Sequence, residues 1–187
     1  MVGVILETVH GSHLYGFAHA DSDYDFYRVI TGGKTMQTVT GKQDIMQVEF
    51  KDFQRLISLG THQALEALYS PIKTVDNRWQ PYFTGFHPDL GQMVYRYTSA
   101  ITNFGTRHQK TPILNFAELQ LKPKRHMLRL ADNLGEYMTK GYFNPRLSTA
   151  KVNEYTDLAT NGSAPEFERE LRTLCPVELP PFLWSES

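Results

Sequence analysis

The chain has 187 residues, 41% of them hydrophobic, and a formal net charge of −1. This length suits one globular domain, or a small domain with a helical companion, and the charge excludes a strongly basic protein that coats nucleic acid. The single cysteine, Cys175, excludes an intramolecular disulfide and argues against a structural zinc site.

The first half of the sequence is typical of strands. Residues 2–9 are mainly aliphatic and β-branched, and they run into the turn His10-Gly11-Ser12. This apolar start is too short to span a bilayer and lacks a basic patch before it, so we expect a soluble, cytoplasmic protein with no membrane partner. A second strand is predicted from Tyr24 to Ile30, with Tyr24 and Phe26 facing the core, and a third from Asp44 to Phe50.

Helical spacing dominates the rest of the chain. Two short helices are predicted on either side of Gly60, and a loop or domain boundary within residues 77–88. Further helices are expected after Asp89, along residues 127–138 and from Ser148 or Thr149 to Leu158, and prolines argue against regular structure after Leu174. The predicted fold class is α/β (α+β), with a small mixed-sheet core in residues 1–85 and a mainly helical region with a proline-containing tail in residues 86–187.

The segment from Gly11 to Asp25 carries the residues typical of phosphate chemistry. Gly11 allows close approach of the backbone to a phosphate, and Ser12 offers a hydroxyl and an amide. Asp23 and Asp25 are two residues apart, so on a strand both carboxylates share a face and can bind divalent cations. A polar turn followed by an exposed strand residue is the more common explanation of a lone acid pair, but it does not require the Gly-Ser turn as well.

This arrangement resembles the DNA polymerase β-like nucleotidyltransferase superfamily, whose signature is a Gly-Ser or Gly-Gly turn followed by an acid-x-acid pair. It is most similar to the predicted nucleotidyltransferases encoded by bacteria and phages. Residues 64–71 resemble that family's "lExLxSP" helix end, and Lys122, His126 and Arg129 resemble its "KxxxHxxR" helix. The sequence departs from the family at Phe26-Tyr27-Arg28, where an arginine-glycine pair is common.

The resemblance implies a third metal-binding carboxylate on a neighbouring strand. Asp44 is favoured because it opens the next predicted strand, and Glu49 is the alternative if the register differs. Lys122, His126 and Arg129 share one helix face, where they can bind the triphosphate or hold the helix in place. They belong to a basic stretch from Arg107 to Arg129.

The predicted reaction transfers a nucleoside monophosphate from a nucleoside triphosphate to an acceptor hydroxyl, with Mg²⁺ or Mn²⁺ as cofactor. Asp23, Asp25 and Asp44 are the catalytic and metal-binding candidates; Gly11, Ser12, Lys122, His126 and Arg129 are the nucleotide-binding ones. The expected acceptor is a nucleic acid, with a protein as second choice. The alternative is an inactive module of the same fold that binds nucleic acid or a protein through its basic helix.

Overall fold

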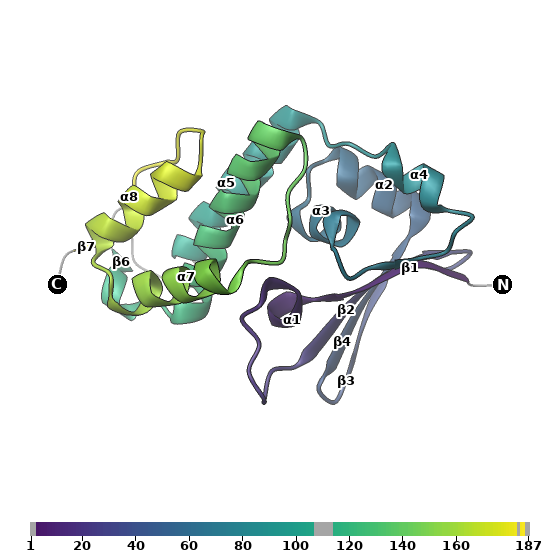
Figure 1. Cartoon of the computed structure of the whole chain (residues 1–187), viewed down its shortest axis with the longest axis horizontal. Coiled ribbons are helices and arrows are strands. Elements are labelled where there is room, and N and C mark those ends of the chain that lie inside the picture. Colours follow the sequence, from purple (N-terminus) through teal and green to yellow (C-terminus); the bar gives the residue numbers. More distant parts are fainter. Residues whose placement is uncertain (1–2, 107–113, 183, 186–187) are drawn as a thin grey trace. The chain divides into compact units, whose positions relative to one another are not determined.

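The computed structural model describes residues 3–106, 114–182 and 184–185. A five-stranded mixed sheet precedes a mainly helical region, which confirms the predicted fold class (Figure 1). The chain divides into two compact units, Met1–Met93 with Asn144–Ser148 and Val94–Phe143 with Thr149–Ser187. Whether residues 1–85 and 86–187 fold as separate domains stays a prediction.

The sheet of the first unit has the strand order β3-β4-β2-β1-β5. Its strands are β1 (Gly3–His10), β2 (Tyr24–Thr31), β3 (Met36–Thr40), β4 (Gln43–Glu49) and β5 (Thr74–Val75). β2 and β4 are parallel, whereas the other neighbouring pairs are antiparallel. β3 was not predicted from the sequence, because its side chains are all exposed and its Gln and Thr residues give no apolar pattern.

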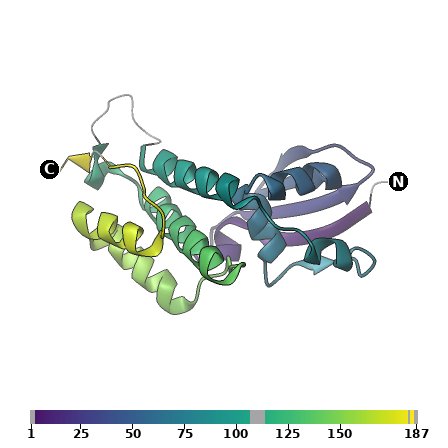
Figure 2. The ribbon, with the colours of Figure 1, turned by 90° about the horizontal axis from the view of Figure 1, so that it is seen from above.

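Helices cover one face of this sheet. α1 (Gly11–Tyr15) follows β1 directly, α2 (Phe50–Ser58) and α3 (His62–Tyr69) lie over the strands, and α4 (Gln80–Thr84) follows β5 (Figures 1 and 2). Tyr27 and Val29 of β2 are buried beneath them, and the Tyr27 ring lies 6.1 Å from that of Phe53 in α2. Gly60, with a φ of 67°, reverses the chain between α2 and α3, as the sequence predicted.

The predicted orientation of β2 was wrong. Tyr24 is 49% exposed and Phe26 is only half-buried, whereas Tyr27 and Val29 fill the core. Because strand side chains alternate between faces, Asp25 lies on the same face as Tyr27 and Val29. The candidate carboxylate therefore stands on the helix-covered face of the sheet, in line with its core residues.

The second unit is mainly helical. It contains most of α5 (Leu90–Thr106), then α6 (Leu121–Lys140), α7 (Thr149–Asn161) and α8 (Ala164–Leu174), with a short 3-10 helix at Phe116–Glu118 and two short paired strands, β6 (Leu114–Asn115) and β7 (Trp184–Ser185). α6, α7 and α8 pack on one another. Gly135 of α6 permits this packing, because a Cβ atom there would lie 2.3 Å from the Leu174 carbonyl oxygen.

Several predictions for these helices are confirmed. Asp89 caps α5 by accepting a hydrogen bond from the Gln92 backbone N–H at 2.8 Å, and α6 ends at Gly141 in the left-handed conformation. The sequence interpretation missed α8, which begins with a capping box between Ser163 and Glu166. It also missed β7, which lies beyond the prolines. In the described ranges, no helix is both long and apolar enough to cross a bilayer.

Candidate functional site

The Gly-Ser turn lies at the point where β1 passes into α1. Gly11 has a φ of 62°, which a residue with a side chain rarely adopts. A Cβ atom on Gly11 would lie 2.0 Å from Oδ2 of Asp25. The backbone conformation favours glycine at this position, and a side chain there would also have to displace the Asp25 carboxylate. The turn and the acid, 14 positions apart in the printed sequence, lie directly against each other.

Asp25 and Asp44 are paired in register on the parallel strands β2 and β4. Paired residues of neighbouring strands point to the same face, and the strands lie about 4.8 Å apart. Oδ2 of Asp44 accepts a hydrogen bond from Nε2 of Gln37 at 2.6 Å. Oδ1 of Asp44 is buried and has no hydrogen-bond partner among the described residues. A buried carboxylate oxygen without a partner is costly, and a cation would compensate it.

The other two acids that the sequence proposed lie in different environments. Asp23 is exposed and comes immediately before the first residue of β2, so it is outside the strand on which it was predicted. Glu49 lies at the opposite end of β4, where its carboxylate accepts a hydrogen bond from the Lys51 backbone N–H at 2.7 Å and caps α2. The register thus brings Asp44, rather than Glu49, beside Asp25.

Ser12 is available to a ligand. Its carbonyl oxygen accepts hydrogen bonds from the backbone N–H groups of Gly16 and Phe17, at 3.1 and 3.0 Å. Its half-buried side-chain hydroxyl makes no hydrogen bond within the described part of the chain. The backbone of Ser12 is therefore used to hold α1, while its hydroxyl is left for another partner.

Asp25 and Asp44 could supply some, but not all, of the ligands of a cation. Among the described residues, no group of three or more His, Cys, Asp or Glu side chains is arranged to hold a metal ion. Mg²⁺, however, commonly binds one or two carboxylates and takes its other ligands from substrate phosphates and water. The partnerless oxygen of Asp44 and the position of Asp25 beside it fit such a cation, with the set of ligands completed by a bound triphosphate.

A buried polar cluster beside the turn was not found from the sequence. Glu66 of α3 is fully buried and accepts a hydrogen bond from the Tyr15 hydroxyl at 2.6 Å. Nε2 of His10 lies 3.2 Å from the same carboxylate oxygen. The alternation of side chains along β1 could have indicated that His10 is buried, because it shares one face with the buried Leu6 and Thr8. Which residue of α3 meets that face is decided by tertiary packing.

The rings on the outer face of the sheet form a separate group. His13 stacks on Tyr24, with ring centroids 4.0 Å apart, and Tyr24 in turn stacks on Phe26 at 6.5 Å. The side chain of Arg28 lies over Phe26 and is ion-paired with Glu7. These contacts explain why aromatic residues alternate with Asp23 and Asp25 without entering the core.

The basic residues of α6 have unequal surroundings. Lys122 is exposed, whereas Arg129 is 1% exposed and lies with Nη2 3.3 Å from Nδ1 of His126. The His126 ring stacks on Phe104 with centroids 5.1 Å apart. Lys124 is also buried, with its ammonium 3.8 Å from the centroid of the Phe116 ring, and burial lowers its pKa.

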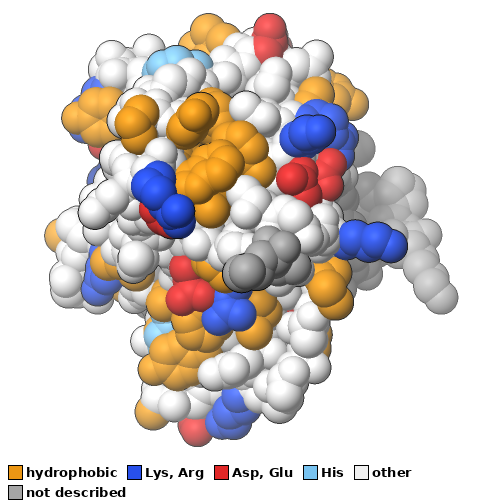
Figure 3. Space-filling view, turned by 90° about the vertical axis from the view of Figure 1, so that its right-hand side faces the viewer, with side chains coloured by type: hydrophobic (Ala, Val, Ile, Leu, Met, Phe, Trp, Pro, Cys, Tyr) orange, Lys and Arg blue, Asp and Glu red, His pale blue; other side chains and the backbone are white. Residues whose placement is uncertain are grey.

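The predicted basic stretch is therefore not an evenly exposed surface. Of its described cations, Lys122 alone is exposed, and Arg107, His108 and Lys110 lie outside the described residues. Figure 3 draws the right-hand side of Figure 1 rather than α6 itself, and there Lys and Arg side chains are likewise interspersed with Asp and Glu among hydrophobic ones. Phosphate binding by Lys122, His126 and Arg129 stays a prediction.

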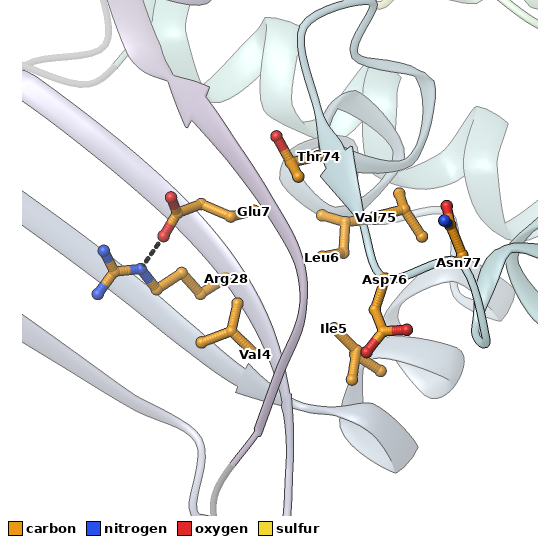
Figure 4. Close-up of a pocket in the computed structure, with 9 residues that line it drawn as sticks. All are labelled: Val4, Ile5, Leu6, Glu7, Arg28, Thr74, Val75, Asp76 and Asn77. Carbon is orange, nitrogen blue, oxygen red and sulfur yellow. Dashed lines mark hydrogen bonds and ion pairs between the residues drawn. The ribbon is translucent and has the colours of Figure 1, made fainter.

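A shallow hollow of about 790 Å³ lies elsewhere on the first unit, lined by residues 4–7, Arg28 and residues 74–77 (Figure 4). Its charged side chains already have partners. Arg28 and Glu7 point toward each other and are ion-paired, and Asp76 is paired with Arg78. Because these charges are neutralised in pairs, the hollow offers a ligand less than the turn and Asp44 do.

Comparison of the sequence with protein-family models and with curated proteins gives no match. The functional assignment therefore depends on the motif and on the geometry of the turn and its acids.

Proposed function

We propose that this protein is a metal-dependent nucleotidyltransferase, which transfers a nucleoside monophosphate from a nucleoside triphosphate to an acceptor hydroxyl and releases pyrophosphate. The observation that carries the proposal is the meeting of three features at one end of the sheet. These are the Gly-Ser turn, the Asp25 carboxylate against it, and the buried oxygen of Asp44 on the paired strand, which has no hydrogen-bond partner in the described part of the chain. A solvent-facing polar turn requires none of this.

The residues have distinct roles in this reaction. The backbone at Gly11 and the hydroxyl of Ser12 would hold the triphosphate. Asp25 and Asp44 would hold Mg²⁺ or Mn²⁺, and Asp23, which lies just before β2, is kept as the third ligand that the sequence motif predicts. When bound, the cation lowers the pKa of the acceptor hydroxyl and neutralises charge on the departing pyrophosphate. Asp44 accepts the proton of the acceptor hydroxyl, the acceptor oxygen bonds to the α-phosphorus, and the bond from that phosphorus to the bridging oxygen breaks.

The proposed acceptor is a nucleic acid, with a protein hydroxyl as the second choice. Lys122 supports a polyanionic acceptor, because it is an exposed cation on a helix whose sequence resembles the family motif. An inactive module of the same fold is the second candidate function. It is favoured by the lack of a group of three metal-binding side chains among the described residues.

The test is incubation of the purified chain with each labelled nucleoside triphosphate, Mg²⁺ or Mn²⁺, and pooled RNA, DNA and protein acceptors. Transfer should fall about a hundredfold or more in Asp44→Asn, because this change removes a proton acceptor and a cation ligand while keeping the shape. Asp25→Asn should also lose activity, because it removes a cation ligand. Asp21→Asn is the matched control, since it removes one exposed charge from the same loop.

Thermal unfolding of the same proteins separates the two candidate functions. A triphosphate with Mg²⁺ should raise the melting temperature of the wild type, and less so that of Ser12→Ala, because a ligand that binds only the folded state stabilises it. Transfer by the wild type that persists unchanged in both Asp25→Asn and Asp44→Asn refutes the proposed site. The absence of both transfer and a thermal shift favours the inactive module.

A further inference from the structure

The buried carboxylate of Glu66 has no part in the chemistry described above. It is fully buried in α3, between the buried residues Leu65 and Ala67. A carboxylate in such a place is costly unless other groups compensate its charge and accepting oxygens. Its Oε2 is held by two aromatic residues of the same unit, the Tyr15 hydroxyl at 2.6 Å and Nε2 of His10 at 3.2 Å.

Both contacts are themselves buried. His10 is 9% exposed and Tyr15 is 3% exposed. Nε2 of His10 is buried and lies at ion-pair distance from the carboxylate, without the direction of a hydrogen bond. The two rings also touch, edge to face, with centroids 5.7 Å apart. Water screens this cluster little, so its interactions are stronger than the same contacts at the surface.

His10 and Tyr15 lie on either side of the Gly-Ser turn in the chain. His10 is the last residue of β1, and Tyr15 is the last residue of α1. Everything between them is the Gly-Ser turn and the short helix that follows it. One carboxylate from a distant segment therefore contacts both ends of the segment that presents Gly11 and Ser12, with a hydrogen bond at Tyr15 and a close contact at His10.

We infer that Glu66 is a positioning residue, which fixes the Gly11–Ser12 turn against Asp25 by holding His10 and Tyr15 at the same time. Its effect on nucleotide binding rests on the proposed function, whereas its effect on the turn does not.

The turn has little freedom relative to Asp25. His10 is the register partner of Asp25 across β1 and β2, and the missing Cβ of Gly11 would lie 2.0 Å from the Asp25 carboxylate. A small movement of the turn thus changes the space between its backbone and that carboxylate. Binding sites tolerate displacements of only about 0.5 Å before affinity suffers, so a support of this kind matters for ligand binding.

A second buried contact also links α3 to β1, without Glu66. Thr8, two residues before His10 on the same face of β1, is joined to Ser70 at the end of α3 by a hydroxyl–hydroxyl contact of 2.7 Å. Both residues are buried. This contact links the same two elements and does not involve the turn, so it provides a matched control.

The experiment compares Tyr15→Phe and Glu66→Gln with the control Thr8→Val. The first removes one hydroxyl, the second removes the charge, and the third removes a buried hydroxyl of the Thr8–Ser70 contact. Hydrogen exchange in the free protein should quicken at the amides of Gly16 and Phe17, which bond to the Ser12 carbonyl. In Tyr15→Phe and Glu66→Gln, we expect the exchange rate at these two amides to increase about tenfold more than the rate at amides of β2. This ratio corresponds to about 1.4 kcal/mol.

Thr8→Val should change the exchange of both groups of amides equally. If Tyr15→Phe and Glu66→Gln also change both groups equally, the positioning role is refuted, whatever the protein binds. Because Tyr15→Phe keeps the ring, it serves as the test if Glu66→Gln does not fold.

The second measurement titrates inorganic tripolyphosphate with Mg²⁺ calorimetrically. Tyr15→Phe should weaken its binding about tenfold, as the loss of supporting residues around a site commonly does, and Thr8→Val should leave the affinity within about twofold. If the wild type binds and Tyr15→Phe binds equally well, the positioning inference fails and the proposed function stands. If the wild type does not bind but the exchange result holds, the proposed function fails and the control of the turn by Glu66 stands.

Discussion

Replacement of Gly11 by alanine should destabilise the first unit more than the same change at Gly41. The two glycines have nearly the same backbone conformation, with φ values of 62° and 59°. A Cβ atom on Gly41 meets nothing within 4 Å, whereas one on Gly11 lies 2.0 Å from Oδ2 of Asp25. Gly41→Ala thus measures the backbone strain alone, and Gly11→Ala adds the steric overlap.

The expected magnitudes follow from these two contributions. Left-handed backbone costs a residue with a side chain about 1–2 kcal/mol. Forcing an extra carbon into occupied space costs about 1–3 kcal/mol more, here through displacement of the Asp25 side chain. Gly41→Ala should therefore lower the free energy of unfolding by about 1–2 kcal/mol and Gly11→Ala by about 2–5 kcal/mol.

Urea unfolding followed by tryptophan fluorescence measures both changes. Trp79 packs on Phe50 with ring centroids 4.8 Å apart and reports on the first unit, so the variants are made in a Trp184→Phe background. A double-mutant cycle then identifies the cause. Once Asp25→Ala removes the carboxylate, the nearest remaining Asp25 atom is its Cβ, at 3.3 Å, and the cost of Gly11→Ala should fall toward that of Gly41→Ala. Equal costs for the two glycine variants, or no coupling to Asp25→Ala, would refute the packing of Gly11 against Asp25.

Three further outcomes are expected. Hydrogen bonds from the side chain and backbone of Arg78 lower the pKa of Asp76 from 3.8 to about 2. The stability that Asp76 contributes over Asp76→Asn should therefore be complete above about pH 4 and be lost as the pH falls through about 2. Urea midpoints across this range check it, and a difference that is undiminished at about pH 2 contradicts it. Gly135→Ala should lower the melting temperature, because its Cβ would lie 2.3 Å from the Leu174 carbonyl oxygen. The cost of this overlap outweighs the gain in helix propensity of about 1 kcal/mol, and a higher melting temperature contradicts the close packing of α6 and α8. Lys122→Glu should leave stability unchanged, because Lys122 is exposed. If Lys122 contacts phosphate, this change should decrease the slope of log affinity for RNA against log salt by about one, and an unchanged slope removes Lys122 from the site.

Features that depend on near neighbours in the chain could be predicted from the amino-acid sequence. Gly11 and Gly141 were predicted as turn and helix-end residues because glycine readily adopts the left-handed conformation that both have. Asp89 was predicted as a cap because the donor it satisfies, the Gln92 N–H, is three residues away. The acid-x-acid pair and the Gly-Ser turn could likewise be recognised from spacing alone.

The face that each strand buries depends on the packing of distant elements and could not be predicted from local pattern. The pattern around β2 alternates aromatic and acidic residues, and the assumption that Tyr24 and Phe26 face the core was wrong because α2 and α3 cover the other side. The aromatic rings stack on one another outside instead. An alternating strand fits either face of a sheet, so its orientation is fixed by the elements packed against it.

The partners of the candidate site were decided in the same way. The strand register placed Asp44, and not Glu49, beside Asp25, because β2 pairs with β4 in parallel and Glu49 comes at the far end, where it caps α2. The contact of Glu66 with His10 and Tyr15 joins segments more than 50 residues apart. Local spacing carries no information on such contacts, because they form only when β1, α1 and α3 pack together and bury a charge that must then be compensated.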